Sequence, residues 1–147
     1  MPRHILDTGV LVELAQRNAF SILSALAPEL PCLVPDEVDA ELRKGRDRYP
    51  AQFELYQKAL RTGLLAVVAF ELGSAEHRQF LSLRSQRTSP QRNRGEDACL
   101  ALALAISDSF VYLADHRAQR RAGALLSARW RALADLPGWP PSEGATS

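Results

Sequence analysis

Short apolar runs alternate along the chain with longer amphipathic segments. Each run spans only a few residues, as expected for strands that are buried on both faces. The runs are at residues 5–6, 32–35, 64–70 and 110–114. Between them, apolar residues recur at spacings of three and four, which predicts helices; these cover 8–17, 21–27, 37–45, 51–61, 73–84, 95–107 and 116–126. This alternation predicts an α/β protein, a three-layer α/β/α sandwich around a short parallel sheet of roughly four to five strands.

The C-terminal quarter has a weaker pattern. Residues 127–136 have helical spacing, and residues 137–147 are rich in proline, glycine and serine. We therefore expect a single domain over 1–136 and a loose tail over 137–147. No convincing strand follows the last predicted helix, 116–126, so the existence of a fifth strand at that edge of the sheet stays open.

Composition is that of a soluble globular domain. The 147 residues are 46% hydrophobic and 24% charged, with a net charge of +1, so the chain can bury one core without disulfides or metals as staples. Cys32 and Cys99 lie inside apolar runs without metal-ligand spacing, which indicates buried thiols in a reducing compartment. No stretch reaches the roughly 18 apolar residues of a membrane helix. We expect a cytoplasmic protein without membrane contact.

Three acids are predicted at one edge of the sheet. Asp7 directly follows the first strand, Asp115 follows the fourth, and Glu96 stands in the first turn of helix 95–107. In a parallel α/β unit, helix N-termini lie at the same edge as strand carboxyl ends, and a fourth strand returning beside the first creates a crevice there. Helix dipole effects and N-capping also explain acids at these places, but they do not predict convergence on one edge.

A fourth acid, Glu41, lies in helix 37–45, one turn beyond Glu37. Carboxylates gathered this closely repel one another unless a cation neutralises them. Ligands that are all oxygen suit Mg²⁺ or Mn²⁺, and such ions support phosphodiester hydrolysis without a nucleophilic side chain. We interpret Glu37 as a solvated residue or a partner of the ligands.

Basic residues concentrate in the polar segment 84–94, which we read as an exposed loop. Its arginines are weak candidates for substrate phosphate contacts; they are Arg84, Arg87, Arg92 and Arg94. Three further arginines follow Asp115 and could act in the same way; they are Arg117, Arg120 and Arg121. An ordinary surface role explains these side chains equally well.

Four segments together resemble PIN-domain nucleases, and most of all the VapC-type ribonuclease toxins of toxin–antitoxin pairs. The segments are ILDTGVLVEL, VPDEVDAELRKG, GEDACLALALA and YLADHRAQRRA, and the match covers residues 3 to 122 in the order of the family. The resemblance implies a PIN-like fold and a metal-dependent endoribonuclease that is neutralised by a small antitoxin and forms a homodimer. It assigns the catalytic and metal-binding acids to Asp7, Glu41, Glu96 and Asp115.

The chain also departs from the family pattern. His116 stands where many relatives carry a further acid or polar ligand, and Gly9 replaces a common serine or asparagine. Asp97 offers an alternative register for the third acid, and His116 is a further candidate ligand. These departures motivate the main alternative function, a catalytically inactive PIN-like binding or assembly module. A nuclease of the same fold directed at DNA is a third hypothesis.

The triplet Asp7-Thr8-Gly9 after Ile-Leu also resembles the active-site turn of aspartic proteases. Those enzymes are nearly all β. The helical spacing over 35–62 and 95–108 excludes that class of protein.

Overall fold

The computed structural model describes residues 1–89 and 92–141. Within them the chain folds around a parallel sheet with the strand order β3-β2-β1-β4-β5. The strands are β1 (Arg3–Leu6), β2 (Cys32–Pro35), β3 (Leu65–Val68), β4 (Ser109–Tyr112) and β5 (Trp130–Arg131). The predicted α/β class and the pairing of the fourth strand with the first are both confirmed.

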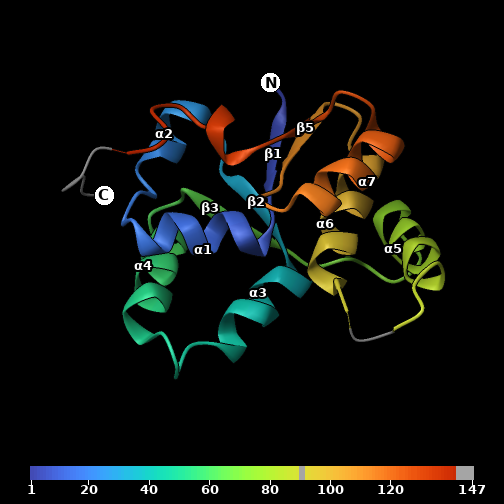
Figure 1. Ribbon diagram of the computed structural model, residues 1–147, viewed down its shortest axis with the longest axis horizontal. Coiled ribbons are helices and arrows are strands. Elements are labelled where there is room, and N and C mark those ends of the chain that lie inside the picture. Colours follow the sequence, from blue (N-terminus) through green and yellow to red (C-terminus); the bar gives the residue numbers. More distant parts are fainter. Residues whose placement is uncertain (90–91, 142–147) are drawn as a thin grey trace.

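Seven α-helices among the described residues connect the strands. They are α1 (Thr8–Gln16), α2 (Ile22–Leu26), α3 (Asp36–Lys44), α4 (Pro50–Arg61), α5 (Ala75–Ser85), α6 (Arg94–Ala105) and α7 (His116–Leu126). In Figure 1, α1 and α4 lie together on one side of the sheet, and α5, α6 and α7 gather on the other. The arrangement is the expected three-layer sandwich.

Helix α6 forms the centre of one layer. It packs against β1, β2 and β4 as well as α3, α5 and α7, and every residue from Asp97 to Ala103 is buried. A helix enclosed in this way has no polar face to turn to water, which explains its continuous apolar sequence. Its N-terminus reaches the carboxyl edge of the sheet between α3 and α7 (Figure 1).

The segment after α7 differs from the prediction. Residues Trp130–Arg131 form the fifth strand, parallel to β4, and Leu133–Asp135 form a 3-10 helix, so the helical interpretation of 127–136 was wrong. A strand of two residues is too short to show an alternating pattern in the sequence. Its contribution to the fold comes from pairing at the sheet edge.

The predicted tail begins inside a packed segment. Trp139 is partly buried against the core, and its ring lies 4.9 Å from the Arg17 guanidinium. Its backbone N–H donates to the Leu136 carbonyl. The remainder of the predicted tail, residues 142–147, lies outside the described residues. Among the helices that the structure describes, none has the length and apolar character needed to traverse a bilayer.

Candidate active site

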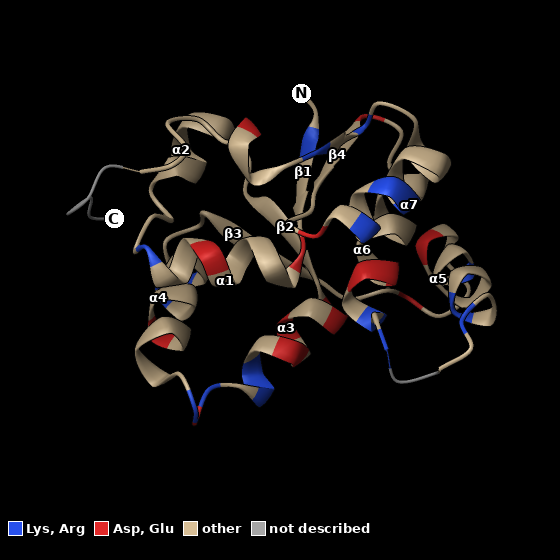
Figure 2. Ribbon diagram, in the orientation of Figure 1, with Lys and Arg blue, Asp and Glu red and all other residues tan. Residues whose placement is uncertain are grey.

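The four predicted acids line one cavity at the carboxyl edge of the sheet. The cavity measures about 400 Å³, and its acidic lining is Asp7, Glu41, Glu96 and Asp115. Figure 2 shows the acidic segments of α3 and α6 and the ends of β1 and β4 approaching one another at this edge. We call this space the acidic cavity.

Asp7 lines the acidic cavity at the junction of β1 and α1. It caps α1, because its Oδ1 accepts a 2.7 Å hydrogen bond from the Thr8 N–H, and its own N–H donates to the Tyr112 carbonyl of β4. The register of β1 against β4 therefore fixes the backbone that carries the carboxylate. Asp7 is thus the N-cap of α1.

The carboxyl group of Asp7 has a strongly raised pKa. Burial raises its pKa from 3.8 to about 7, against the lowering effect of the Thr8 N–H. The carboxylates of Glu41, Glu96 and Asp115 contribute to this rise. A carboxylate in this position is stabilised as an anion only when a cation joins it.

Glu41 crosses the cavity from α3 and is held at both oxygens. Its Oε2 accepts a 2.7 Å hydrogen bond from the Thr8 hydroxyl, and its Oε1 accepts a 2.9 Å bond from the Gly95 N–H. A Cβ at position 95 would meet Oε1 at 2.5 Å, so only glycine lets the backbone approach. Thr8 and Gly95 are site residues that the sequence reasoning did not assign.

Glu37 faces a different neighbour from Glu41. Its carboxylate pairs with the Arg94 guanidinium at 2.9 Å, and it lines a separate cavity with Phe70 and Phe80. The choice of Glu41 over Glu37 is therefore consistent with the geometry.

Glu96 lies in the first turn of α6, with one oxygen turned toward arginines. Its Oε2 accepts hydrogen bonds from Arg87 at 2.6 Å and from Arg121 at 3.1 Å. Charge-assisted hydrogen bonds from two guanidinium groups thus hold one oxygen of Glu96 in place. They also fix the direction of the side chain.

Asp97, the alternative third acid, lies outside the acidic cavity. Its side chain is 0% exposed and forms ion pairs with Arg84 and Arg87, each at 2.8 Å, and with Arg121. Burial alone would raise its pKa, but hydrogen bonds from these arginines hold the pKa below the ordinary value. The geometry thus favours Glu96 as the acid of α6 that faces the cavity.

Asp115 caps α7 and accepts hydrogen bonds from the N–H groups of Arg117 and Ala118, both at 3.3 Å. His116 beside it is exposed and does not line the acidic cavity. Gly9 does line it, and a Cβ there would meet Ala114 Cβ at 3.2 Å. Glycine therefore leaves room for the loop that carries Asp115.

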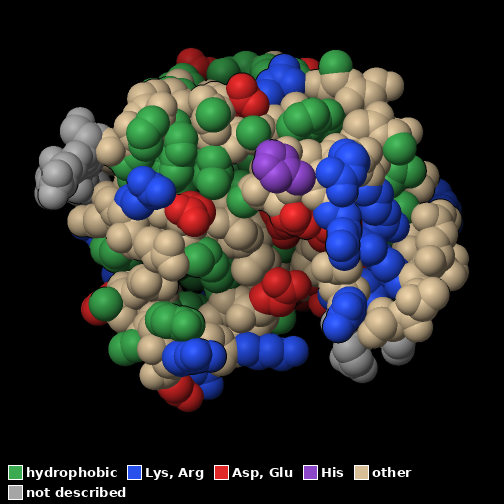
Figure 3. Space-filling view, viewed as in Figure 1, with side chains coloured by type: hydrophobic (Ala, Val, Ile, Leu, Met, Phe, Trp, Pro, Cys, Tyr) green, Lys and Arg blue, Asp and Glu red, His purple; other side chains and the backbone are tan. Residues whose placement is uncertain are grey.

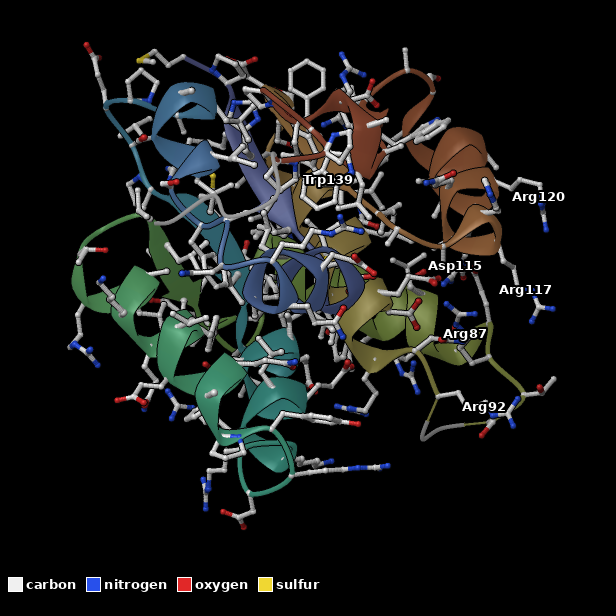
Figure 4. The ribbon with its side chains drawn as sticks, turned by 60° about the vertical axis from the view of Figure 1, so that its left-hand side comes forward. Arg87, Arg92, Asp115, Arg117, Arg120 and Trp139 are labelled. Atoms are coloured by element: carbon white, nitrogen blue, oxygen red, sulfur yellow. The ribbon has the colours of Figure 1, made fainter. Side chains whose placement is uncertain are left out.

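The segment 84–94 is less exposed than we predicted. Arg84 belongs to α5, with a side chain only 10% exposed, and Arg94 opens α6. Arg84 and Arg87 point into the ion pairs with Asp97, whereas Arg92 is exposed. Figure 4 shows Arg117 and Arg120 extending outward from α7, so the outward basic surface comes mainly from α7.

The donor set fits a hard divalent cation, because it consists of carboxylate oxygens. Among residues 1–89 and 92–141, however, no three His, Cys, Asp or Glu side chains have the mutual geometry of a metal site. The hydrogen bonds of Glu41 and Glu96 explain this, since they turn oxygens toward Thr8, Gly95 and the arginines. Cys99 contacts Asp7 Oδ1 at 3.9 Å, and burial raises its thiol pKa, which leaves a neutral neighbour.

Comparison with known families agrees with this geometry. A family model described as a PIN domain, a nuclease-type fold, matches residues 3–131. A direct search of curated protein sequences returns no match. The matched region includes all four acids of the cavity and extends through β5. The chain belongs to the PIN-domain family.

Proposed function

We propose that the protein is a metal-dependent endoribonuclease that hydrolyses RNA phosphodiester bonds. The single observation that carries the proposal is the acidic cavity, in which four carboxylates from four separate segments of the chain line one space. The capping and dipole roles of the separate acids do not require this convergence. Membership of a family with a nuclease-type fold gives the cavity a chemical context.

The four carboxylates would hold Mg²⁺ or Mn²⁺, and the bound metal would supply activation of water and neutralisation of phosphate charge. Asp7 contributes the carboxylate whose pKa is raised to about 7 by burial and by the neighbouring acids, so its anionic form needs a cation beside it. Thr8 and Gly95 position Glu41, and Arg87 and Arg121 position Glu96. These residues keep the ligands in place without contacting the substrate.

The basic surface of α7 would attract the substrate backbone. Arg117 and Arg120 are exposed and point away from the body of the protein (Figure 4). Cations beside an acidic cavity offer a polyanion a path toward a metal that the acids hold. Figure 3 shows the large basic group directly beside the acidic side chains.

The test compares wild-type protein with Asp7→Asn on a single-stranded RNA in the presence of Mg²⁺ or Mn²⁺. Asp7→Asn should reduce cleavage to background while the circular dichroism spectrum stays native. Glu54→Gln, at an exposed acid of α4 outside the acidic cavity, is the matched control and should cleave normally. Equal cleavage by wild type and Asp7→Asn would refute the assignment.

RNA as substrate and a role as the toxin of a toxin–antitoxin pair rest on the resemblance of the four motifs to VapC-type toxins. We propose a small antitoxin and a second copy of the chain as partners on the same basis. Competition between RNA and DNA of one sequence separates the ribonuclease from a DNA-directed nuclease. If unlabelled DNA inhibits cleavage of the labelled RNA more strongly than unlabelled RNA does, the ribonuclease assignment is contradicted.

One observation favours a second candidate function, an inactive binding or assembly module. Both oxygens of Glu41 and one oxygen of Glu96 accept hydrogen bonds from other groups. Titration with Mn²⁺ distinguishes the two functions, because an active site should bind the ion in a manner that depends on Glu96 and Asp115. Saturable binding lost in both Glu96→Gln and Asp115→Asn supports the nuclease.

A further inference from the structure

A second cavity adjoins the acidic cavity and shares its wall. It measures about 190 Å³ and lies between α1, α3 and α4, with Thr8 and Glu41 common to both spaces. Its floor is formed by Leu11, Ala15 and Tyr56, which are buried. Its outer lining includes Tyr49, Gln52 and Phe53. We call this space the aromatic cavity.

The aromatic cavity is rigid at its floor and open at its rim. The Tyr56 hydroxyl donates a 2.7 Å hydrogen bond to Asp39, which fixes the ring. Tyr49 is 49% exposed, so its ring is accessible to a ligand at the rim. Across the part of the chain that the structure describes, the Gln52 amide has no hydrogen bond to another residue. The cavity therefore offers aromatic surface and one uncommitted amide.

We propose that the aromatic cavity binds a nucleobase of single-stranded RNA, next to the phosphate that the acidic cavity receives. The inference rests on the proposed function and deepens it. Because Thr8 and Glu41 separate the two spaces, one nucleotide can place its phosphate in one and its base in the other. A neutral, planar group suits this space, since Glu41 in the wall repels anions and the remaining lining is mostly apolar.

Positive charge extends on the far side of the aromatic cavity as well. The turn between α3 and α4 carries Arg46 and Arg48, both exposed, and Arg48 lies 5.4 Å from the Tyr49 ring. Figure 2 shows basic positions on this turn at the bottom of the view and on α7 at the right. Sequence-tolerant binding of single strands combines such a basic path with aromatic stacking surfaces.

This arrangement selects single strands over duplexes. A base can enter the aromatic cavity only when it is unpaired and turned out of a stack, as in loops and single-stranded ends. The Gln52 amide can donate and accept hydrogen bonds, so it can meet the edge of more than one base. We therefore expect strong discrimination against duplex RNA and weaker discrimination among bases.

An apolar side chain of a protein partner is the competing occupant. The cations of the α3–α4 turn and of α7, together with the wall shared with the acidic cavity, favour a ligand that joins a neutral ring to a phosphate. A protein side chain needs neither feature. The two occupants differ in their dependence on the base, which can be removed from an RNA without changing its backbone.

The experiment measures binding of a short single-stranded RNA that carries one 2-aminopurine, in the Asp7→Asn background so that no cleavage occurs. Tyr49→Ala should weaken binding about tenfold and reduce the fluorescence quenching that stacking causes. Tyr49→Phe, which keeps the ring, should retain the affinity. Leu72→Ala, at a side chain that is 90% exposed and lies outside both cavities, is the surface control.

An RNA with an abasic site in place of 2-aminopurine completes the design. The Tyr49→Ala variant and its parent should bind this RNA equally. Equal losses on both RNAs, or no loss on either, would overturn the nucleobase site and leave the cavity to another occupant, such as a partner's side chain.

Cleavage by the otherwise wild-type chain separates this proposal from the proposed function. Cleavage that is unaffected by Tyr49→Ala in both KM and kcat keeps the ribonuclease and overturns the nucleobase site. Base-dependent binding without any metal-dependent cleavage keeps the nucleobase site as a binding function and overturns the ribonuclease.

Discussion

Asp7 and Asp97 are two carboxylates in opposite electrostatic surroundings; Asp97 is fully buried and Asp7 is partly buried. Asp97 has three guanidinium groups around it, which hold its pKa below the ordinary value. Asp7 has three acids near it, and its pKa rises to about 7. The protein's own arginines neutralise Asp97, whereas neutralisation of Asp7 requires a bound cation. That difference separates a structural anchor from a candidate metal ligand.

Glu96 lies on the boundary between these two surroundings. It lines the acidic cavity, yet its Oε2 belongs to the arginine cluster formed by Arg84, Arg87 and Arg121 around Asp97. The arginine cluster thus extends from a core position to the edge of the acidic cavity. Loss of the Asp97 carboxylate should therefore also change the position of Glu96 in the acidic cavity.

The largest expected effect is on stability, from Asp97→Asn. The substitution leaves three mostly buried guanidinium groups without their shared counter-ion, and breaking a buried ion pair typically costs about 3–5 kcal/mol. Glu96 still pairs with Arg87 and Arg121, so we expect the lower end of that range, about 3 kcal/mol. Urea denaturation measures the change in the free energy of unfolding. A loss below about 1 kcal/mol would show that the arginine cluster is not an anchor.

In the metal-free protein, Asp7→Asn should have the opposite effect and raise the free energy of unfolding. The raised pKa means that the folded state holds its proton more tightly than the unfolded chain, so wild-type stability falls as pH rises from about 4 to about 7. Each pKa unit corresponds to about 1.4 kcal/mol, and relaxation of the cavity reduces the full shift. We expect Asp7→Asn to be more stable than wild type by on the order of 2 kcal/mol at pH 8, and similar at pH 4.

The measurement is urea denaturation with EDTA at both pH values, with Glu54→Gln as the matched control. Added Mn²⁺ should close the gap at pH 8, because it binds the folded wild type and stabilises it by mass action. An Asp7→Asn variant less stable than wild type at pH 8 would mean that Asp7 is a structural acid like Asp97.

The sequence alone predicted the features that topology determines. Asp7, Glu96 and Asp115 share an edge because parallel strands end there and helix N-termini return there. The β1–β4 pairing follows from the same rule and is confirmed. The role of Asp7, Glu41, Glu96 and Asp115 as metal ligands stays a prediction, although the structure brings them to one cavity.

Features that depend on side-chain partners distant in the sequence were not predictable. The sequence indicated loop cations at Arg84 and Arg87, because no sequence pattern pairs them with Asp97, which read as an alternative site acid. Thr8 and Gly95 hold Glu41 from segments 33 and 54 residues away. The strand Trp130–Arg131 is too short to show an alternating pattern of apolar and polar residues, and only its pairing with β4 identifies it.

The smallest effects come from a matched pair of arginine substitutions, Arg87→Gln and Arg94→Gln. Arg87 bridges Glu96 and Asp97 with a side chain 21% exposed, whereas Arg94 pairs with Glu37 and is 42% exposed. Hydrogen bonds to charged groups contribute about 1.5–3 kcal/mol and exposed pairs about 0.2–1 kcal/mol. We expect a loss near 1.5 kcal/mol for Arg87→Gln and below about 1 kcal/mol for Arg94→Gln.

The same pair separates structural arginines from substrate-binding ones. Binding of single-stranded RNA to an Asp7→Asn background, measured against salt concentration, reports phosphate contacts as a change in slope. Arg87→Gln should lower stability and leave the salt slope unchanged, because its guanidinium is committed to the two acids. A reduced slope with unchanged stability would assign Arg87 to the RNA, and the contrast between Asp7 and Asp97 would then rest on Arg84 and Arg121 alone.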